Sequence, residues 1–151
     1  MQWTATAQAN ATPCDVLQVL THPEEIRRWS PVEFDLDGLD GRRLAAGTRG
    51  RVTGRVAGVT VGFDVKVHAA SEARLELSAE GPVAFDVRYE LVPAEVGAEL
   101  SASVSVRRGG GLTGRLVEKA TAALLSAGAL EGAAGRIARA AESQSRAVAA
   151  C

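Results

Sequence analysis

Between residues 32 and 107 apolar and polar side chains alternate with a period of two, and no other feature of the chain limits its fold as strongly. A segment with this alternation has one apolar face and one polar face, as a strand does when it separates a core from water. Short turns that contain glycine separate the segments, so consecutive strands are expected to pair as hairpins. The pattern therefore predicts an antiparallel sheet.

The N-terminal segment shows the same alternation and adds one strand to this sheet. The expected strands are residues 2–9, 33–37, 51–56, 59–68, 74–78, 83–91 and 100–106. A sheet of about seven strands is large enough to curve strongly.

One turn predicts a register. If Ala57 and Gly58 form a two-residue hairpin loop, counting outward places Arg51 opposite Asp64 on the wet face. On the dry face the same count places Val52 opposite Phe63.

Two short helices are expected after the first strand. Thr12-Pro13-Cys14-Asp15 offers a capping threonine, a proline at the first helical position and an acid in the first turn. Thr21-His22-Pro23-Glu24 repeats this type of start, and Pro31 limits the second helix. We expect tandem helices that are broken at Thr21.

The C-terminal part of the chain predicts a long helix. After Gly109-Gly110-Gly111 small and apolar residues recur at helical spacing, and the helix is expected to reach about Glu142. Gly128, Gly132 and Gly135 each cost roughly 1 kcal/mol relative to alanine, which argues against one straight helix.

Several classes of partner are not expected. The net charge is -1 and no basic cluster interleaves with aromatic residues, so nucleic acid is an unsuitable partner. Charges interrupt the alanine-rich end, so integral membrane association is not expected either. The N-terminus lacks the basic and apolar regions of a secretion signal, and we expect a cytoplasmic protein.

Cofactor and metal sites are also not expected. Gly109 to Gly114 match G-x-G-x-x-G, but the preceding strand alternates as an antiparallel strand and no strand follows the helix, so we expect no dinucleotide. Cys14 and Cys151 fit no metal-ligand spacing, and we expect a reduced, buried Cys14 and no disulfide.

The segment Leu20-Thr21-His22-Pro23-Glu24-Glu25-Ile26-Arg27-Arg28-Trp29 resembles the "LTDPE…RW" signature of the polyketide cyclase/dehydrase and lipid-transport group of the START/Bet v 1-like (SRPBCC) superfamily. Gly47-Thr48-Arg49 and Gly111-Leu112-Thr113-Gly114-Arg115-Leu116 also resemble segments of that group. The resemblance implies an α+β helix-grip fold over residues 1–151 as a single domain. In this fold a curved antiparallel sheet wraps a long C-terminal helix, and two short helices follow the first strand.

The resemblance and the small residues of the last helix imply an internal cavity for an apolar small molecule, such as a lipid, a steroid or a polyketide. Trp29 is expected near its mouth. The other residues expected to bind the ligand are Phe34, Phe63, Val65, Phe85, Val87, Tyr89, Leu116, Ala120 and Leu124. We expect a monomer or a homodimer.

Catalysis is left open by the sequence. The charged strand residues fall on the wet face, so Tyr89 is the ionisable strand residue that is expected inside, and His22 lies near a possible entrance. These two residues are the catalytic candidates if the protein is a cyclase or dehydratase. The alternatives are a carrier without catalysis and a ligand-dependent interaction protein of the same fold.

Overall fold

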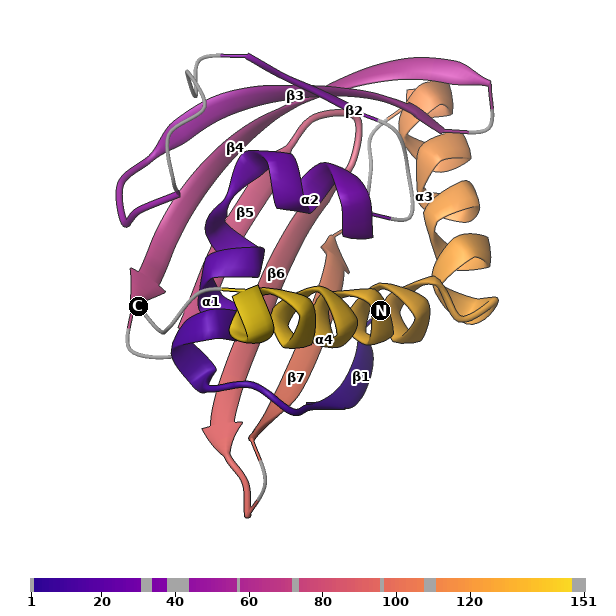
Figure 1. Cartoon of the computed structure of the whole chain (residues 1–151). Coiled ribbons are helices and arrows are strands. Elements are labelled where there is room, and N and C mark those ends of the chain that lie inside the picture. Colours follow the sequence, from indigo (N-terminus) through magenta and orange to yellow (C-terminus); the bar gives the residue numbers. More distant parts are fainter. Residues whose placement is uncertain are drawn as a thin grey trace.

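One curved antiparallel sheet of seven strands forms the frame of the described part of the chain (Figure 1). The computed structural model describes residues 2–30, 34–37, 44–56, 58–71, 74–95, 97–107 and 111–147. The strands are β1 (Gln2–Ala9), β2 (Phe34–Asp37), β3 (Arg49–Val56), β4 (Val59–Ser71), β5 (Arg74–Glu80), β6 (Ala84–Pro93) and β7 (Ala98–Arg107). Their order in the sheet is β1-β7-β6-β5-β4-β3-β2, so β1 and β2 are the edges.

The register between β3 and β4 agrees with the count from the turn. Arg51 pairs with Asp64, and Val52 pairs with Phe63. The Arg51 guanidinium donates from Nη1 to Oδ1 of Asp64 at 3.0 Å on the exposed face. Gly58 has a φ of 78°, a left-handed conformation that glycine adopts without steric cost. The strand predictions and this register are confirmed.

The two short helices are α1 (Pro13–Thr21) and α2 (Pro23–Trp29). The Thr12 side chain caps α1 by accepting a hydrogen bond from the Asp15 backbone N–H at 3.2 Å. The predicted capping role of Thr21 is wrong, because this residue ends α1 and its hydroxyl donates to the Leu17 carbonyl at 2.8 Å. His22 is the N-cap of α2 and makes no side-chain capping bond.

The predicted C-terminal helix is divided in two, α3 (Gly111–Ser126) and α4 (Ala129–Ala147). The break occurs at Gly128, whose φ of 97° ends the regular helix. Gly132 and Gly135 lie inside α4. As Figure 1 shows, α4 crosses the concave side of the sheet, whereas α3 stands at its margin beside β3.

The main core lies between α4, α1 and the β1–β7–β6 part of the sheet. Small residues on one face of α4 surround Ile137 and let the helix approach its neighbours closely. The buried members of this face are Leu130, Ala133, Ala134, Ile137, Ala138 and Ala141. Arg136 connects α4 to the end of α2 by donating from Nε to the Trp29 carbonyl at 3.0 Å.

The expectation for the first cysteine is wrong. Cys14 is exposed in the first turn of α1 and is disulfide-bonded, whereas the sequence predicted a reduced and buried thiol. Cys151, the other cysteine of the chain, lies outside the described residues.

A matched pair of glycine substitutions tests the β6–β7 turn. Gly97 and Gly58 both have positive φ, but a Cβ on Gly97 would collide with the carbonyl oxygen of Ala9, whereas a Cβ on Gly58 meets no atom within 4 Å. Gly58→Ala should cost about 1–2 kcal/mol of unfolding free energy from backbone conformation alone. Gly97→Ala should cost roughly 1–3 kcal/mol more, because the backbone of β1 must move. Urea unfolding followed by circular dichroism measures both losses, and equal losses would contradict the close approach.

Candidate functional site

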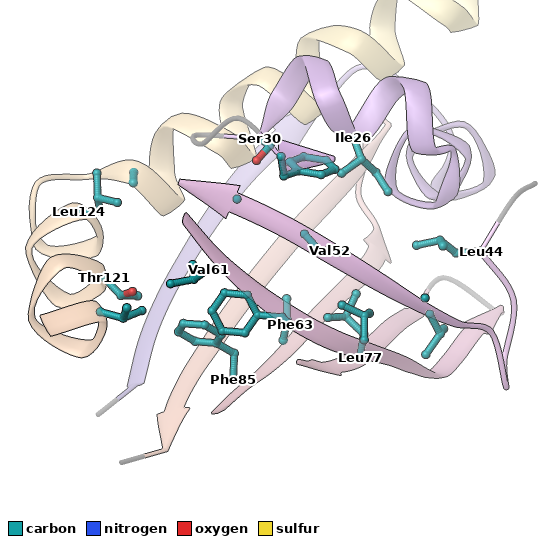
Figure 2. A pocket seen from close by; sticks show the side chains of 18 of the residues that line it. Ile26, Ser30, Leu44, Val52, Val61, Phe63, Leu77, Phe85, Thr121 and Leu124 are labelled. Carbon is teal, nitrogen blue, oxygen red and sulfur yellow. The ribbon is translucent and has the colours of Figure 1, made fainter. Parts of the chain in front are cut away.

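An apolar cavity of about 350 Å³ lies between the concave face of the sheet, α2 and α3 (Figure 2). Its lining is formed by Ile26, Ser30, Phe34, Leu44, Thr48, Gly50, Val52, Gly54, Val61, Phe63, Val65, Val67, Leu77, Phe85, Val87, Val117, Thr121, Leu124, Leu125 and Ala129. The volume is at the lower end of the range of small-molecule sites.

The walls contributed by the sheet are hydrocarbon. Alternate residues of β3, β4, β5 and β6 point inward, and the charged residues between them point to the convex face. Phe63 and Phe85 stand side by side in this wall, with ring centroids 5.4 Å apart and planes inclined at 50°. The alternation that gives the sheet its register therefore also keeps strand charges out of the cavity.

Two glycines leave room in the wall. Gly54 lies in the ladder between Phe34 of β2 and Val61 of β4, and it carries no side chain toward the cavity. Gly50 lines the same wall earlier on β3. Glycine in a strand interior often marks a place where another molecule approaches the backbone.

Hydroxyls are the polar side chains of the cavity lining. They belong to Ser30 at the end of α2, Thr48 before β3 and Thr121 on α3. The Thr48 hydroxyl accepts a hydrogen bond from the Ala45 backbone N–H at 3.0 Å. Charged and ionisable side chains are absent from the described residues that line the cavity.

Six of the ten residues that the sequence predicts around the ligand line this cavity. They are Phe34, Phe63, Val65, Phe85, Val87 and Leu124. Residues from loops and helix ends complete the wall and were missed, among them Leu44, whose backbone N–H donates to the Thr21 carbonyl at 2.8 Å. Periodicity in the sequence cannot identify a cavity residue that lies in a loop, because loops have no repeating pattern of polar and apolar residues.

Leu116 and Ala120 were expected to face the ligand, but the structure turns α3 the other way. Val117, Thr121 and Leu125, spaced four residues apart, face the cavity. Leu116 is 46% exposed and Leu112 is 87% exposed. The α3 helix carries apolar residues on two faces. Leu112 and Leu116 lie on the more exposed face, whereas Leu124, at the far end of the same face, lines the cavity although it is 39% exposed.

Trp29 and Tyr89 lie in the packed core and not among the residues that line the cavity. Their rings meet edge to face, with centroids 5.9 Å apart and planes at 73°. Trp29 Nε1 donates to the Val19 carbonyl at 3.1 Å, which holds α2 against α1. Tyr89 follows Phe85 and Val87 on the inner face of β6, but at its level the core residues of α1 and α2 cover the strand.

The two catalytic candidates are far from equivalent in their surroundings. Burial raises the pKa of the Tyr89 hydroxyl well above its ordinary value, so this group keeps its proton throughout the neutral range. His22 is exposed at the start of α2 and does not line the cavity. The structure thus brings neither residue to the cavity wall.

Neither a metal centre nor a membrane span is found in the described part of the chain. No group of three or more histidine, cysteine, aspartate or glutamate residues is arranged to hold a metal ion there. Among the described helices, none is long and apolar enough to span a bilayer.

Comparison with known proteins gives one family and many similar folds. Residues 2–142 match the model of a family described as polyketide cyclase/dehydrase and lipid transport. A search of the curated proteins found no match.

Three solved structures illustrate the similarity. TTHA0849 from Thermus thermophilus has a TM-score of 0.73 at 18% identity, over 96% of this chain and 99% of that chain. Ara h 8.0201 has a TM-score of 0.59 at 16% identity, over 91% and 97% of the two chains. A START superfamily protein from Mycobacterium smegmatis has a TM-score of 0.56 at 18% identity, over 87% and 94%. At these identities the likeness concerns the fold.

The buried tyrosine gives a direct test of the core on β6. Tyr89 is the single tyrosine of the chain, so its ultraviolet titration is unambiguous. Unfolded in urea, the protein should form tyrosinate near the ordinary pKa of 10.0, while the folded protein should not. Because the folded-state pKa is raised, the stability that Tyr89 contributes is present below about pH 10 and is lost as the pH rises further. Tyr89→Phe should reduce this alkaline loss, and a folded protein that titrates near 10.0 would contradict the burial.

Proposed function

Because this chain belongs to the polyketide cyclase/dehydrase and lipid transport family, within the START/Bet v 1-like superfamily, we propose that it binds a hydrophobic small molecule in the cavity between its sheet and α3. The observation that carries the proposal is the lining itself, in which hydrocarbon side chains predominate and three hydroxyls are the polar groups. Each buried methylene group of a ligand contributes about 0.8 kcal/mol of transfer free energy in such a site.

The same lining favours a carrier over a cyclase or dehydratase. General acid–base chemistry needs an ionisable side chain within hydrogen-bond reach of the reacting group. The described residues that line the cavity include none, and the two candidates from the sequence, Tyr89 and His22, are not among them. We therefore propose binding and carriage of the ligand as the function, without a chemical step at these residues.

Two replacements of alanine by tryptophan, one inside the cavity and one outside it, test whether this cavity is the binding site. Ala129 lines the cavity at the start of α4, whereas Ala127, two residues earlier, is exposed. An uncharged apolar fluorophore should bind the unchanged protein with increased emission. Ala129→Trp should weaken binding at least about tenfold by filling the space, in line with the cost of overpacking. Ala127→Trp should leave binding unchanged.

The outcome that would refute the proposal is specific. If both variants remain folded by circular dichroism and bind the fluorophore equally well, the probe does not occupy this cavity. If the unchanged protein binds no apolar probe at all, the proposal of a hydrophobic ligand fails as a whole.

A further inference from the structure

The few polar side chains that line the cavity limit the chemical class of ligand that it can bind. Its three polar side chains are neutral hydroxyls, and the described lining contains no arginine, lysine or histidine. The part-buried arginine near α2, Arg136, donates its Nε to the Trp29 carbonyl and is not part of the lining. The arginines of the strands, such as Arg51 and Arg88, form ion pairs on the convex face.

A carboxylate ligand therefore meets no opposite charge in the described part of the cavity wall. Moving an ion out of water without a partner costs several kcal/mol even after the protein relaxes. A fatty acid whose carboxyl group enters the cavity avoids this cost by taking up a proton. At about pH 7 only a small fraction of a carboxylic acid is protonated, so little of it is in the form that the cavity accepts. An alcohol, a ketone or an ester with the same hydrocarbon chain does not carry this penalty.

Thr121 offers such a ligand a specific hydrogen-bond partner. Its side chain lies on the cavity side of α3 (Figure 2). Val117 and Leu125, four residues before and after it on the same helix, also line the cavity. Among the described residues, none forms a hydrogen bond with the Thr121 hydroxyl. By contrast, the Thr48 hydroxyl is already used by the Ala45 backbone. A hydroxyl can both donate and accept, so it suits either an alcohol or a carbonyl oxygen.

We propose that the cavity selects uncharged ligands over carboxylates, and that one ligand hydroxyl or carbonyl oxygen hydrogen bonds with Thr121. This inference rests on the proposed function and adds the ligand class to it. The contrast with the apolar wall gives the ligand an orientation: its single polar end lies at α3 and its hydrocarbon part lies against Phe63 and Phe85.

Three ligands with the same ten-carbon chain separate the effect of ligand charge on affinity from the effect of ligand shape. The competition assay uses displacement of the apolar fluorophore by n-decanol, methyl decanoate and decanoate. At about pH 7, n-decanol and methyl decanoate should displace the probe, and decanoate should be roughly 100-fold weaker, because a carboxyl of this kind ionises near pH 4–5. Between about pH 7 and pH 5 the apparent affinity for decanoate should rise about tenfold per pH unit, while that for n-decanol stays constant.

Thr121→Val tests the hydrogen bond, because valine keeps the shape of threonine and removes only the hydroxyl. This variant should weaken n-decanol about 3- to 10-fold and leave the apolar fluorophore unaffected. Thr113→Val is the matched control, since Thr113 is exposed on the same helix and does not line the cavity. It should leave all affinities unchanged.

The possible failures are distinguishable. Decanoate that binds as tightly as n-decanol at about pH 7 overturns the selection against charge, while the fluorophore result upholds the proposed function. An unchanged affinity of Thr121→Val for both n-decanol and methyl decanoate overturns the role of Thr121. Absence of fluorophore binding overturns the proposed function, and this inference with it.

Discussion

The structure depends on how closely its C-terminal helices can cover the apolar face of the sheet. Beyond Gly128 the buried face of α4 consists mainly of alanine, so this helix packs tightly against β1, β7 and α1. The α3 helix, which precedes the turn at Gly128, lies beside β3 at the margin of the sheet. The part of the concave face under α4 is thus filled by close packing. The part beside α3 is not filled, and Val117 and Leu125 of α3 line the space that remains. This space, between the sheet, α2 and α3, is the cavity.

Much of the sheet could be predicted because a strand offers only two choices for each side chain. Once Gly58 fixes one hairpin, the pleat determines which residues face each other, and the Arg51–Asp64 pair follows by counting. The same rule places Phe63 and Phe85 inside and the charges outside. The neutral wall of the cavity is therefore largely a consequence of the sequence pattern.

The helices were harder to predict for a physical reason. The α3 helix has apolar residues on two faces, so periodicity alone cannot choose between Leu116 and Val117 as the inward residue. The choice depends on how α3 packs beside β3 and α4 in the assembled fold. Similarly, alternation predicts that Tyr89 points inward, but not which helix lies above it. Whether an inward residue of a strand meets the cavity or the packed core depends on which helix covers that part of the strand, and the local sequence does not indicate this.

Strands β1 and β7 are neighbours in the sheet, although they come from distant parts of the chain. Gln2 and Ser103, which are 101 positions apart, hydrogen bond through their side chains at 3.2 Å, and β1 pairs with β7 along its whole length. The strands from β3 to β7 form hairpins between neighbours, so they can assemble from local contacts. Strand β1 must close a loop of almost the entire sheet before it gains a partner, at a cost in chain entropy that slows folding. Until then β7 is an open edge, and the surface on which α4 packs lacks the part that β1 provides.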